Sequence, residues 1–335
     1  MSEYCRKNTI MPERFIDLLD RHDFFVLTTH DPADADGIGA QMVLACILSE
    51  RGKRFKIINA SPVPEQFRFM DSLARIECWD EGKHRALAEQ GALVILDTAD
   101  EHTLGKMTEV CGQSREVFVI DHHEPKPQAA FFGIYDSAAA STCELAVEIA
   151  EAAGATLDAE TAFAAYTGMA YDTGFFAYPK TGPKTFRTAI SLLERGANPS
   201  TAFELLCQNT STRTLFLQKK AIGSMVIYLG GKVAVQVLRN EDFSETGTTL
   251  EDTDGIVNFP LKSRDIAVSL LLKESPDKKV RCSLRSKGLT NVAKIAQEFG
   301  GGGHLNAAGF KSKLDVDQTL EKTIASIAGL LEGQQ

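Results

Sequence analysis

Four apolar residues followed by an acid and two imidazoles make up the stretch Val117-Phe118-Val119-Ile120-Asp121-His122-His123. Its β-branched and aromatic residues are typical of a buried strand. Charged groups that leave water need a partner. An acid and two histidines at the end of a buried strand therefore indicate a bound ligand.

Three more segments repeat this pattern of an apolar run that ends in polar groups. Residues 24–29 lead into His30, with Asp34 and Asp36 close behind, residues 93–96 lead into Asp97, and a helical stretch delivers Asp172. Carboxylate and imidazole ligands suit Mn²⁺ or Mg²⁺ better than a thiolate-bound metal. The sequence thus predicts one metal centre assembled from distant parts of the chain.

The first half of the chain alternates between apolar runs of strand length and amphipathic helical stretches. Expected strands span 24–29, 54–59, 92–97, 116–121 and 131–135, and expected helices span 37–51, 65–72, 142–153 and 159–171. This alternation predicts an α/β fold with a mostly parallel sheet and helices on both faces. Ligands of such sheets collect at the carboxyl ends of the strands, where the polar groups above fall.

A second, smaller α/β domain is expected across a cleft from the first. Its strands are expected at 221–229, 232–237, 265–272 and 279–286, and its helices at 291–299 and 316–331. We predict a catalytic metal-binding domain over 1–195, a helical linker over 196–220 and a substrate-binding domain over 221–335.

Composition limits the class of protein. The 335 residues suffice for two domains, and the hydrophobic content of 44% is ordinary for a soluble globular protein. A net charge of −9 argues against a broad nucleic-acid-binding surface, although bound divalent cations can reverse the local field around a phosphate. Seven scattered cysteines without a C-x-x-C pair, a polar N-terminus and the lack of a long apolar run predict a cytoplasmic protein.

Each acidic residue also has an ordinary interpretation. Asp36 would cap a helix that opens at Gly37, Asp97 would enter a turn, and Asp172 would end a helix. Together, however, these carboxylates would repel one another and resist full ionisation unless cations neutralise them. Two divalent ions about 3.5–4 Å apart are the usual device for hydrolysing phosphate esters and anhydrides.

A glycine-rich motif follows in the C-terminal half. Gly300-Gly301-Gly302-Gly303 can bring backbone amides close to an anion, and His304 can hydrogen-bond a phosphate or a base; the alternative is a flexible turn. Arg281 and Arg285 alternate on one expected strand, so they share a face that either binds phosphate or is merely charged surface. His22, His84 and His102 lie in polar sequence, which indicates surface positions.

Taken together, the motifs resemble the DHH phosphoesterase superfamily. They are His30-x-x-x-Asp34-x-Asp36, Asp97, Asp121-His122-His123, Asp172 and the Gly300–His304 run. The C-terminal motif is similar to the DHH-associated domain of oligoribonucleases, nanoRNases and cyclic-dinucleotide phosphodiesterases. It does not resemble the second domain of the family's pyrophosphatases.

The resemblance implies a role for each of these positions. One Mn²⁺ would be held by His30, Asp34 and Asp97, and the other by Asp36, Asp97, His122 and Asp172. His123 would contact the scissile phosphate or assist the leaving group, with Asp121 ordering the histidines. The substrate would be bound by Arg285, together with Arg281, and by Gly301, Gly302, Gly303 and His304.

The activity implied is Mn²⁺-dependent hydrolysis of short RNA to nucleoside 5′-monophosphates, with Mg²⁺ as the other possible metal. Removal of the 3′-phosphate from adenosine 3′,5′-bisphosphate is a second implied activity. Open alternatives are a pyrophosphatase or exopolyphosphatase, a cyclic-dinucleotide phosphodiesterase and a non-catalytic nucleotide-binding regulator. The expected partner is a short RNA or a small phosphorylated nucleotide, with no membrane and no long duplex nucleic acid; a homodimer is left open.

Overall fold

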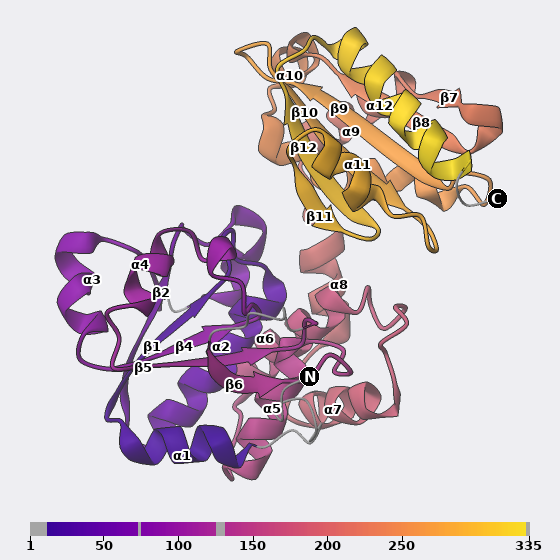
Figure 1. The fold of residues 1–335 in the computed structure, drawn as a ribbon. Helices are drawn as coiled ribbons and strands as arrows, with labels where there is room; N and C mark the ends of the chain where they lie inside the picture. The colour runs from indigo at the N-terminus through magenta and orange to yellow at the C-terminus, as the bar shows by residue number, and fades with distance from the viewer. Residues whose placement is uncertain (1–11, 73–74, 125–130, 333–335) are drawn as a thin grey trace. The chain divides into compact units, whose positions relative to one another are not determined.

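The computed structural model describes residues 12–72, 75–124 and 131–332. The chain divides into two compact units, residues 1–209 and 210–335 (Figure 1). Each unit contains its own six-stranded sheet. Among the described residues, no helix is long and apolar enough to cross a membrane.

The first unit is built on a parallel sheet with strand order β3-β2-β1-β4-β5-β6. Its strands are β1 (Phe24–Thr29), β2 (Arg54–Asn59), β3 (Ile76–Cys78), β4 (Ala92–Leu96), β5 (Glu116–Asp121) and β6 (Phe132–Tyr135). The strand order reverses between β1 and β4, which creates a topological switch point there. The prediction of a mostly parallel sheet is confirmed.

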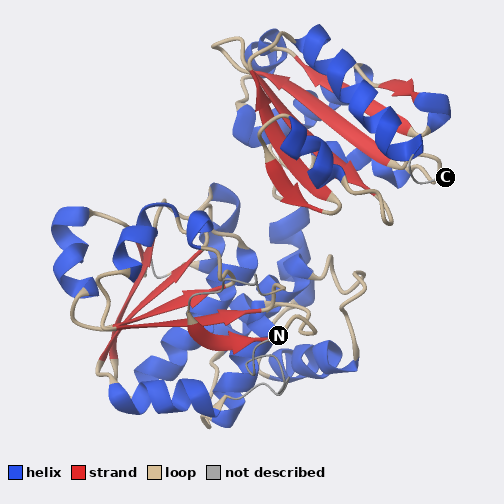
Figure 2. Cartoon of the chain, viewed as in Figure 1, coloured by secondary structure: helices blue, strands red, loops and turns tan. Residues whose placement is uncertain are grey.

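Helices cover both faces of this sheet (Figures 1 and 2). They are α1 (Glu13–Arg21), α2 (Ala35–Glu50), α3 (Glu81–Ala88), α4 (Thr108–Cys111), α5 (Thr142–Ala152), α6 (Ala159–Asp172), α7 (Pro183–Glu194) and α8 (Pro199–Cys207). Phe25, Leu27 and Phe118 pack into the core beneath α1, α2 and α5, whereas Val26 and Ile95 pack into the opposite core with α4. Burial of both faces explains why β4 is apolar along its whole length and β1 is apolar up to Thr28.

The second unit holds a mixed sheet with strand order β11-β12-β10-β9-β8-β7, in which only β8 and β9 pair in parallel. Its strands are β7 (Val226–Tyr228), β8 (Val233–Leu238), β9 (Val268–Glu274), β10 (Val280–Ser286), β11 (Gly302–His304) and β12 (Ala307–Ser312). Its helices are α9 (Thr212–Gly223), α10 (Asn240–Thr246), α11 (Val292–Glu298) and α12 (Val316–Glu332).

Several expected elements differ in the structure. The strand expected at 221–229 is wrong at its start, because Ala221 is fully buried within α9 and only Val226–Tyr228 pairs with β8. The helix expected from Gly37 begins two residues earlier, at Ala35. Strands β3, β11 and β12 were not expected.

The expected surface position of His84 is also wrong. Its side chain is 1% exposed, and its Nε2 lies 3.1 Å from Glu77 Oε2 while its Nδ1 accepts the Asp80 amide. Glu77 additionally pairs with Lys56 and Lys83. Hydrogen bonds from Lys56 and then Lys83 lower the pKa of Glu77 to about 2.

Glu77→Gln is expected to destabilise the protein at pH 7 by about 1 kcal/mol, the upper end for partly exposed ion pairs. A carboxylate whose pKa is lowered in the folded state contributes stability that is fully present above its unfolded pKa. That contribution is lost as pH falls toward about 2. Urea unfolding should therefore separate the variant from wild type at pH 7 and bring them together near pH 2.5; an equal gap at both pH values would contradict this origin.

Candidate metal centre

The predicted ligands follow the carboxyl ends of neighbouring parallel strands. His30 comes directly after β1, Asp97 directly after β4, and His122 directly after β5. Strands β1 and β4 flank the switch point of the sheet, which is where ligands of such sheets bind. The topology of the sheet therefore gathers residues that are distant in sequence.

The other carboxylates lie at the start of α2 and at the end of α6. Asp34 is the N-cap of α2, since its Oδ1 accepts the amides of Asp36 at 3.0 Å and Gly37 at 3.1 Å. The alternative interpretation of Asp36 as the helix cap is therefore wrong: Asp36 lies in the first turn of α2 and is fully buried. Asp172 is the last residue of α6.

Three groups of side chains in the described part of the chain have ligand atoms within 4.8 Å of one another. They are His30 with Asp34 and Asp97; Asp36 with His122 and Asp172; and Asp97 with His122 and His123. All six predicted metal ligands fall in these groups. His123, expected to contact phosphate, belongs to the third.

Asp97 connects the groups through its two oxygens. Its Oδ2 lies 3.5 Å from His30 Nε2, whereas its Oδ1 lies 3.5 Å from His122 Nε2. Its backbone has a φ of 63°, a left-handed conformation that Asp and Asn tolerate better than most residues. The carboxylate thus faces two separate sets of ligand atoms.

The His122 ring is oriented as a ligand. Its Nδ1 lies 3.4 Å from the Ala139 carbonyl oxygen, and its buried Nε2 has no hydrogen-bond partner. That Nε2 lies 3.3 Å from Asp172, 3.5 Å from Asp97 and 4.0 Å from Asp36. Ligands about 2.1 Å from one octahedral ion lie about 3 Å apart when adjacent and about 4 Å apart when opposed. The donor set therefore fits a hard divalent cation.

Without cations, protons neutralise part of the cluster. Burial and then the charges of Asp36 and Asp34 raise the pKa of Asp172 to about 7. Burial, followed by the charge of Asp36, raises the pKa of Asp97 well above its usual range. Burial opposes protonation of His30, but its hydrogen bonds to Asp34 and Asp97 outweigh this and raise its pKa to about 11. Divalent ions would remove the repulsion that these shifts reflect.

The N-terminus of α5 holds two of the carboxylates. The amides of Thr142 and Cys143 donate to Asp36 at 2.6 and 2.9 Å, and the Thr142 hydroxyl donates to Asp97 Oδ1 at 2.8 Å. Sequence reasoning missed Thr142. The Ser141-Thr142-Cys143-Glu144 run has the pattern of a capping box, which could have identified exposed amides at this helix start.

Asp121 and His123 form a pair at the edge of the cluster. Asp121 Oδ1 lies 2.8 Å from His123 Nδ1 and accepts the His123 amide at 3.0 Å. The hydrogen bond to Asp121 raises the pKa of His123 to about 9, against the effect of burial. The side chain of His123 is 46% exposed.

The substrate-binding candidates all belong to the second unit. Arg281 and Arg285 lie on one face of β10, and Arg281 pairs across the sheet with Lys311 on one side and Lys273 on the other. Burial and then the charge of Arg281 lower the pKa of Lys273. Sequence reasoning missed Lys273 and Lys311, whose common face with the arginines depends on strand register.

The second half of the glycine run is a strand, not the flexible turn that was the alternative interpretation. Gly302 and His304 begin and end β11, and a Cβ at Gly301 or Gly303 would lie within 2.5 Å of β12 atoms. Close strand packing therefore explains two of the glycines. The side chain of His304 lies outside the described residues.

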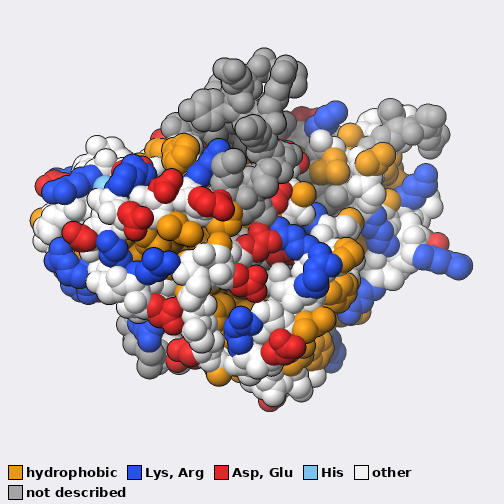
Figure 3. Space-filling view, turned by 90° about the horizontal axis from the view of Figure 1, so that it is seen from below, with side chains coloured by type: hydrophobic (Ala, Val, Ile, Leu, Met, Phe, Trp, Pro, Cys, Tyr) orange, Lys and Arg blue, Asp and Glu red, His pale blue; other side chains and the backbone are white. Residues whose placement is uncertain are grey.

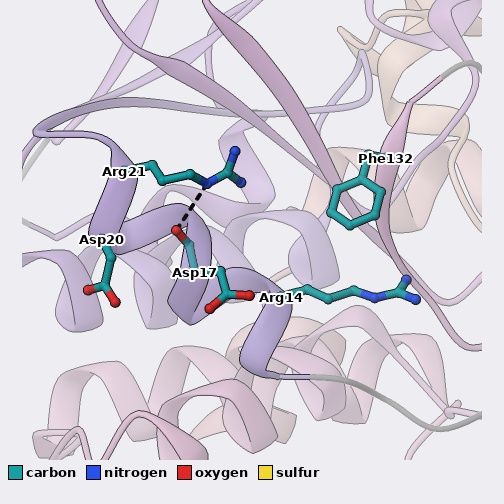
Figure 4. Close-up of a pocket in the computed structure, with 5 residues that line it drawn as sticks. All are labelled: Arg14, Asp17, Asp20, Arg21 and Phe132. Atoms are coloured by element: carbon teal, nitrogen blue, oxygen red, sulfur yellow. Dashed lines mark hydrogen bonds between the residues drawn. The ribbon is translucent and has the colours of Figure 1, made fainter.

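One surface pocket of about 410 Å³ lies elsewhere on the first unit (Figure 4). Arg14, Asp17, Asp20 and Arg21 of α1 line it together with Phe132 of β6. The Arg14 guanidinium stacks over the Phe132 ring at 5.3 Å. No predicted ligand lines this pocket.

Comparison with known families agrees with the geometry. Residues 25–169 match the N-terminal domain of the DHH family, and residues 230–332 match the DHHA1 domain. The chain belongs to the DHH family. It is accordingly a hydrolase of phosphate esters, which confirms the resemblance and the predicted enzyme class.

Relatives of this DHH protein match most of its length. It is 28% identical over 304 residues to the bifunctional oligoribonuclease and PAP phosphatase NrnA of Thermus thermophilus, covering 90% of this chain and 88% of that one. It is 27% identical to the protein of the same name from Bacillus subtilis, covering 89% and 92%. A crystal structure of an exopolyphosphatase-related protein from Bacteroides fragilis has a TM-score of 0.90 at 24% identity and covers 97% of this chain, which supports the fold.

Proposed function

We propose that this DHH protein is a Mn²⁺-dependent phosphodiesterase that hydrolyses short oligoribonucleotides to nucleoside 5′-monophosphates. The observation that carries the proposal is Asp97, whose two oxygens face His30 on one side and His122 on the other. A shared carboxylate between two ligand sets is the arrangement that a two-metal site needs.

In this proposal, six side chains hold two ions. His30, Asp34 and Asp97 hold one, and Asp36, Asp97, His122 and Asp172 hold the other. Bound there, the two ions would supply a nucleophile at neutral pH and stabilise charge on the reacting phosphate. Mn²⁺ is favoured over Mg²⁺ because two of the ligands are imidazoles.

The remaining residues act on the phosphate and on the ligands. His123, held by Asp121, binds the scissile phosphate and gives a proton to the departing 3′-oxygen. The Thr142 hydroxyl fixes one oxygen of Asp97, and the α5 amides fix Asp36. Cleavage of the bond between phosphorus and the 3′-oxygen leaves the phosphate on the 5′-oxygen. The product is therefore a nucleoside 5′-monophosphate.

The substrate class is supported by the relatives and by the second unit. Relatives that match about 90% of the chain are named oligoribonuclease and PAP phosphatase, where PAP is adenosine 3′,5′-bisphosphate. The shared face of Arg281, Arg285, Lys273 and Lys311 concentrates positive charge, which suits an anionic nucleotide. We therefore include removal of the 3′-phosphate of PAP as a second activity.

A short or small substrate also agrees with the surface. On the face in Figure 3, the described Lys and Arg side chains alternate with Asp and Glu side chains and with hydrophobic ones. Long duplexes favour an extended basic surface instead. A cytoplasmic location is part of the proposal and is supported by six described cysteines that are free thiols.

A substrate panel tests the proposal against its alternatives. With Mn²⁺, we expect turnover of a 5′-phosphorylated diadenylate (pApA) and of PAP, and much slower turnover of pyrophosphate, polyphosphate and cyclic di-AMP. Faster hydrolysis of pyrophosphate or polyphosphate would instead support a pyrophosphatase or exopolyphosphatase. Preferred cleavage of cyclic di-AMP would support a cyclic-dinucleotide phosphodiesterase, and binding without turnover would support a regulator.

Arg285→Ala is expected to raise KM for pApA about 10-fold with little change in kcat, because a charge-assisted phosphate contact is lost. Arg264→Ala is the matched control. Its side chain is 94% exposed, and its ion-pair partner in the described part of the chain is its neighbour Asp265. Steady-state kinetics with both variants separate a substrate contact from surface charge. Equal KM values for the two variants would contradict the role of Arg285.

A further inference from the structure

The loop after α6 lies next to the metal-ligand cluster and is held by many interactions. The amides of Phe175, Ala177 and Tyr178 all donate to backbone oxygens of residues 170 and 173. Phe175 packs edge-on against Phe203 at 5.2 Å, and Phe176 stacks on Phe186 at 5.6 Å. The loop is thus fixed at several points.

This loop also contains two unusual backbone conformations. Phe175 and Phe176 have φ values of 55° and 64°, which are costly for aromatic residues. Such residues persist only where their surroundings determine them, and they cluster at functional sites. The ring contacts and the backbone hydrogen bonds, including that from the Thr181 amide to the Tyr178 carbonyl at 3.0 Å, fix the path over residues 177–181.

That path brings Lys180 to the cluster. Its Nζ donates to the His122 carbonyl oxygen at 3.2 Å, although the side chain extends from an exposed position. Its charge acts on both His122 and Asp172, the two ligands that approach each other at 3.3 Å. An ammonium has three donors, so the His122 carbonyl accounts for one of them.

Sequence neighbours show that this placement is particular to Lys180. Lys184, four residues later, lies 2.6 Å from Glu148 and 3.5 Å from Glu144, so carboxylates neutralise it. Among the described residues, no carboxylate oxygen forms an ion pair with Lys180. An ammonium fixed by a backbone carbonyl keeps its charge available for an anion.

We propose that Lys180 binds a non-bridging oxygen of the substrate phosphate next to the metal centre. This inference rests on the proposed function, since the anion is the phosphate group that the metal centre would hydrolyse. Lys180 would thereby be a substrate contact within the first unit. A point charge of this kind strengthens binding of the substrate and transition state alike, so it should lower KM more than it raises kcat.

The test uses the full chain with Lys180→Met, which keeps the apolar stem and removes the charge, and Lys180→Arg, which keeps the charge. Lys184→Met is the matched control. We expect Lys180→Met to raise KM for pApA in Mn²⁺ by about 10- to 100-fold with kcat within threefold, as for a lost charge-assisted contact. Lys180→Arg should recover most of the loss, and Lys184→Met should stay within twofold.

Two equilibrium measurements distinguish this role from a structural one. Calorimetric binding of AMP in Mn²⁺ should weaken about 10-fold in Lys180→Met, while Mn²⁺ affinity, read from the free-ion EPR signal, should stay within twofold. A KM and an AMP affinity within twofold of wild type would overturn the proposal, as would weakened Mn²⁺ binding alone. Failure of wild type to cleave pApA would count against the proposed function, whereas the AMP comparison judges Lys180 separately.

Discussion

Asp97→Asn is expected to abolish Mn²⁺-dependent turnover, by at least about 10³-fold, while raising the thermal stability of the metal-free protein. Turnover is lost because this side chain faces both ligand sets, so loss of its carboxylate weakens the binding of both ions. Stability rises because burial and the charge of Asp36 raise the pKa of Asp97 in the folded protein. A carboxyl group with a raised pKa lowers the free energy of unfolding at every pH above its unfolded pKa, and asparagine removes that cost. Asparagine also accepts the φ of 63°.

Melting curves and kinetics on the same samples check this prediction. Mn²⁺ should raise the Tm of wild type more than that of Asp97→Asn, because bound metal stabilises only the state that binds it. Asp100→Asn is the control, since Asn also serves as an N-cap at this position and Asp100 belongs to none of the ligand groups in the described residues. Near wild-type turnover by Asp97→Asn would contradict the two-metal site, and a lowered Tm would contradict the electrostatic argument.

His123→Ala is expected to lower kcat by about 10²–10⁴-fold, the range for loss of a general acid. Mn²⁺ affinity should fall much less, because His123 is 46% exposed and its Nδ1 is already hydrogen-bonded to Asp121 at 2.8 Å. Asp121→Asn should lower kcat by about 10–100-fold, as expected for a group that acts by orienting another.

Kinetics at saturating Mn²⁺, combined with Mn²⁺ titrations, separate the two roles that His123 can have. The group of Asp97, His122 and His123 is itself close enough to hold an ion. A loss of Mn²⁺ affinity as large as that for His122→Ala would show that His123 is a ligand. Unchanged kcat would contradict both roles.

The first unit was largely predictable because burial leaves clear patterns. Strands β1, β2 and β5 have the ranges expected from the sequence. The apolar runs within β1 and β5 are continuous because a parallel sheet covered on both faces buries both sides of its central strands. The polar residues that follow them were conspicuous for the same reason. Strand β3 was missed because Ile76–Cys78 is three residues long and only partly buried.

The second unit was less predictable because its local sequence does not favour its structure. Gly302-Gly303 has low strand propensity, yet pairing with Ala308 and Gly309 of β12 makes it a strand. The contributions of Thr142 and Lys180 depend on the start of α5 and on a loop with positive φ, neither of which an isolated sequence specifies. Lys273 lies opposite Arg281 only because of the register between β9 and β10.

The most direct test of the central claim is chromatographic analysis of products from pApA, with Mn²⁺ added or chelated. A two-metal phosphodiesterase should release AMP with Mn²⁺ and none with chelator, and readdition of Mn²⁺ should restore release. Absence of AMP from folded, Mn²⁺-loaded protein, or equal release in the presence of chelator, would contradict it.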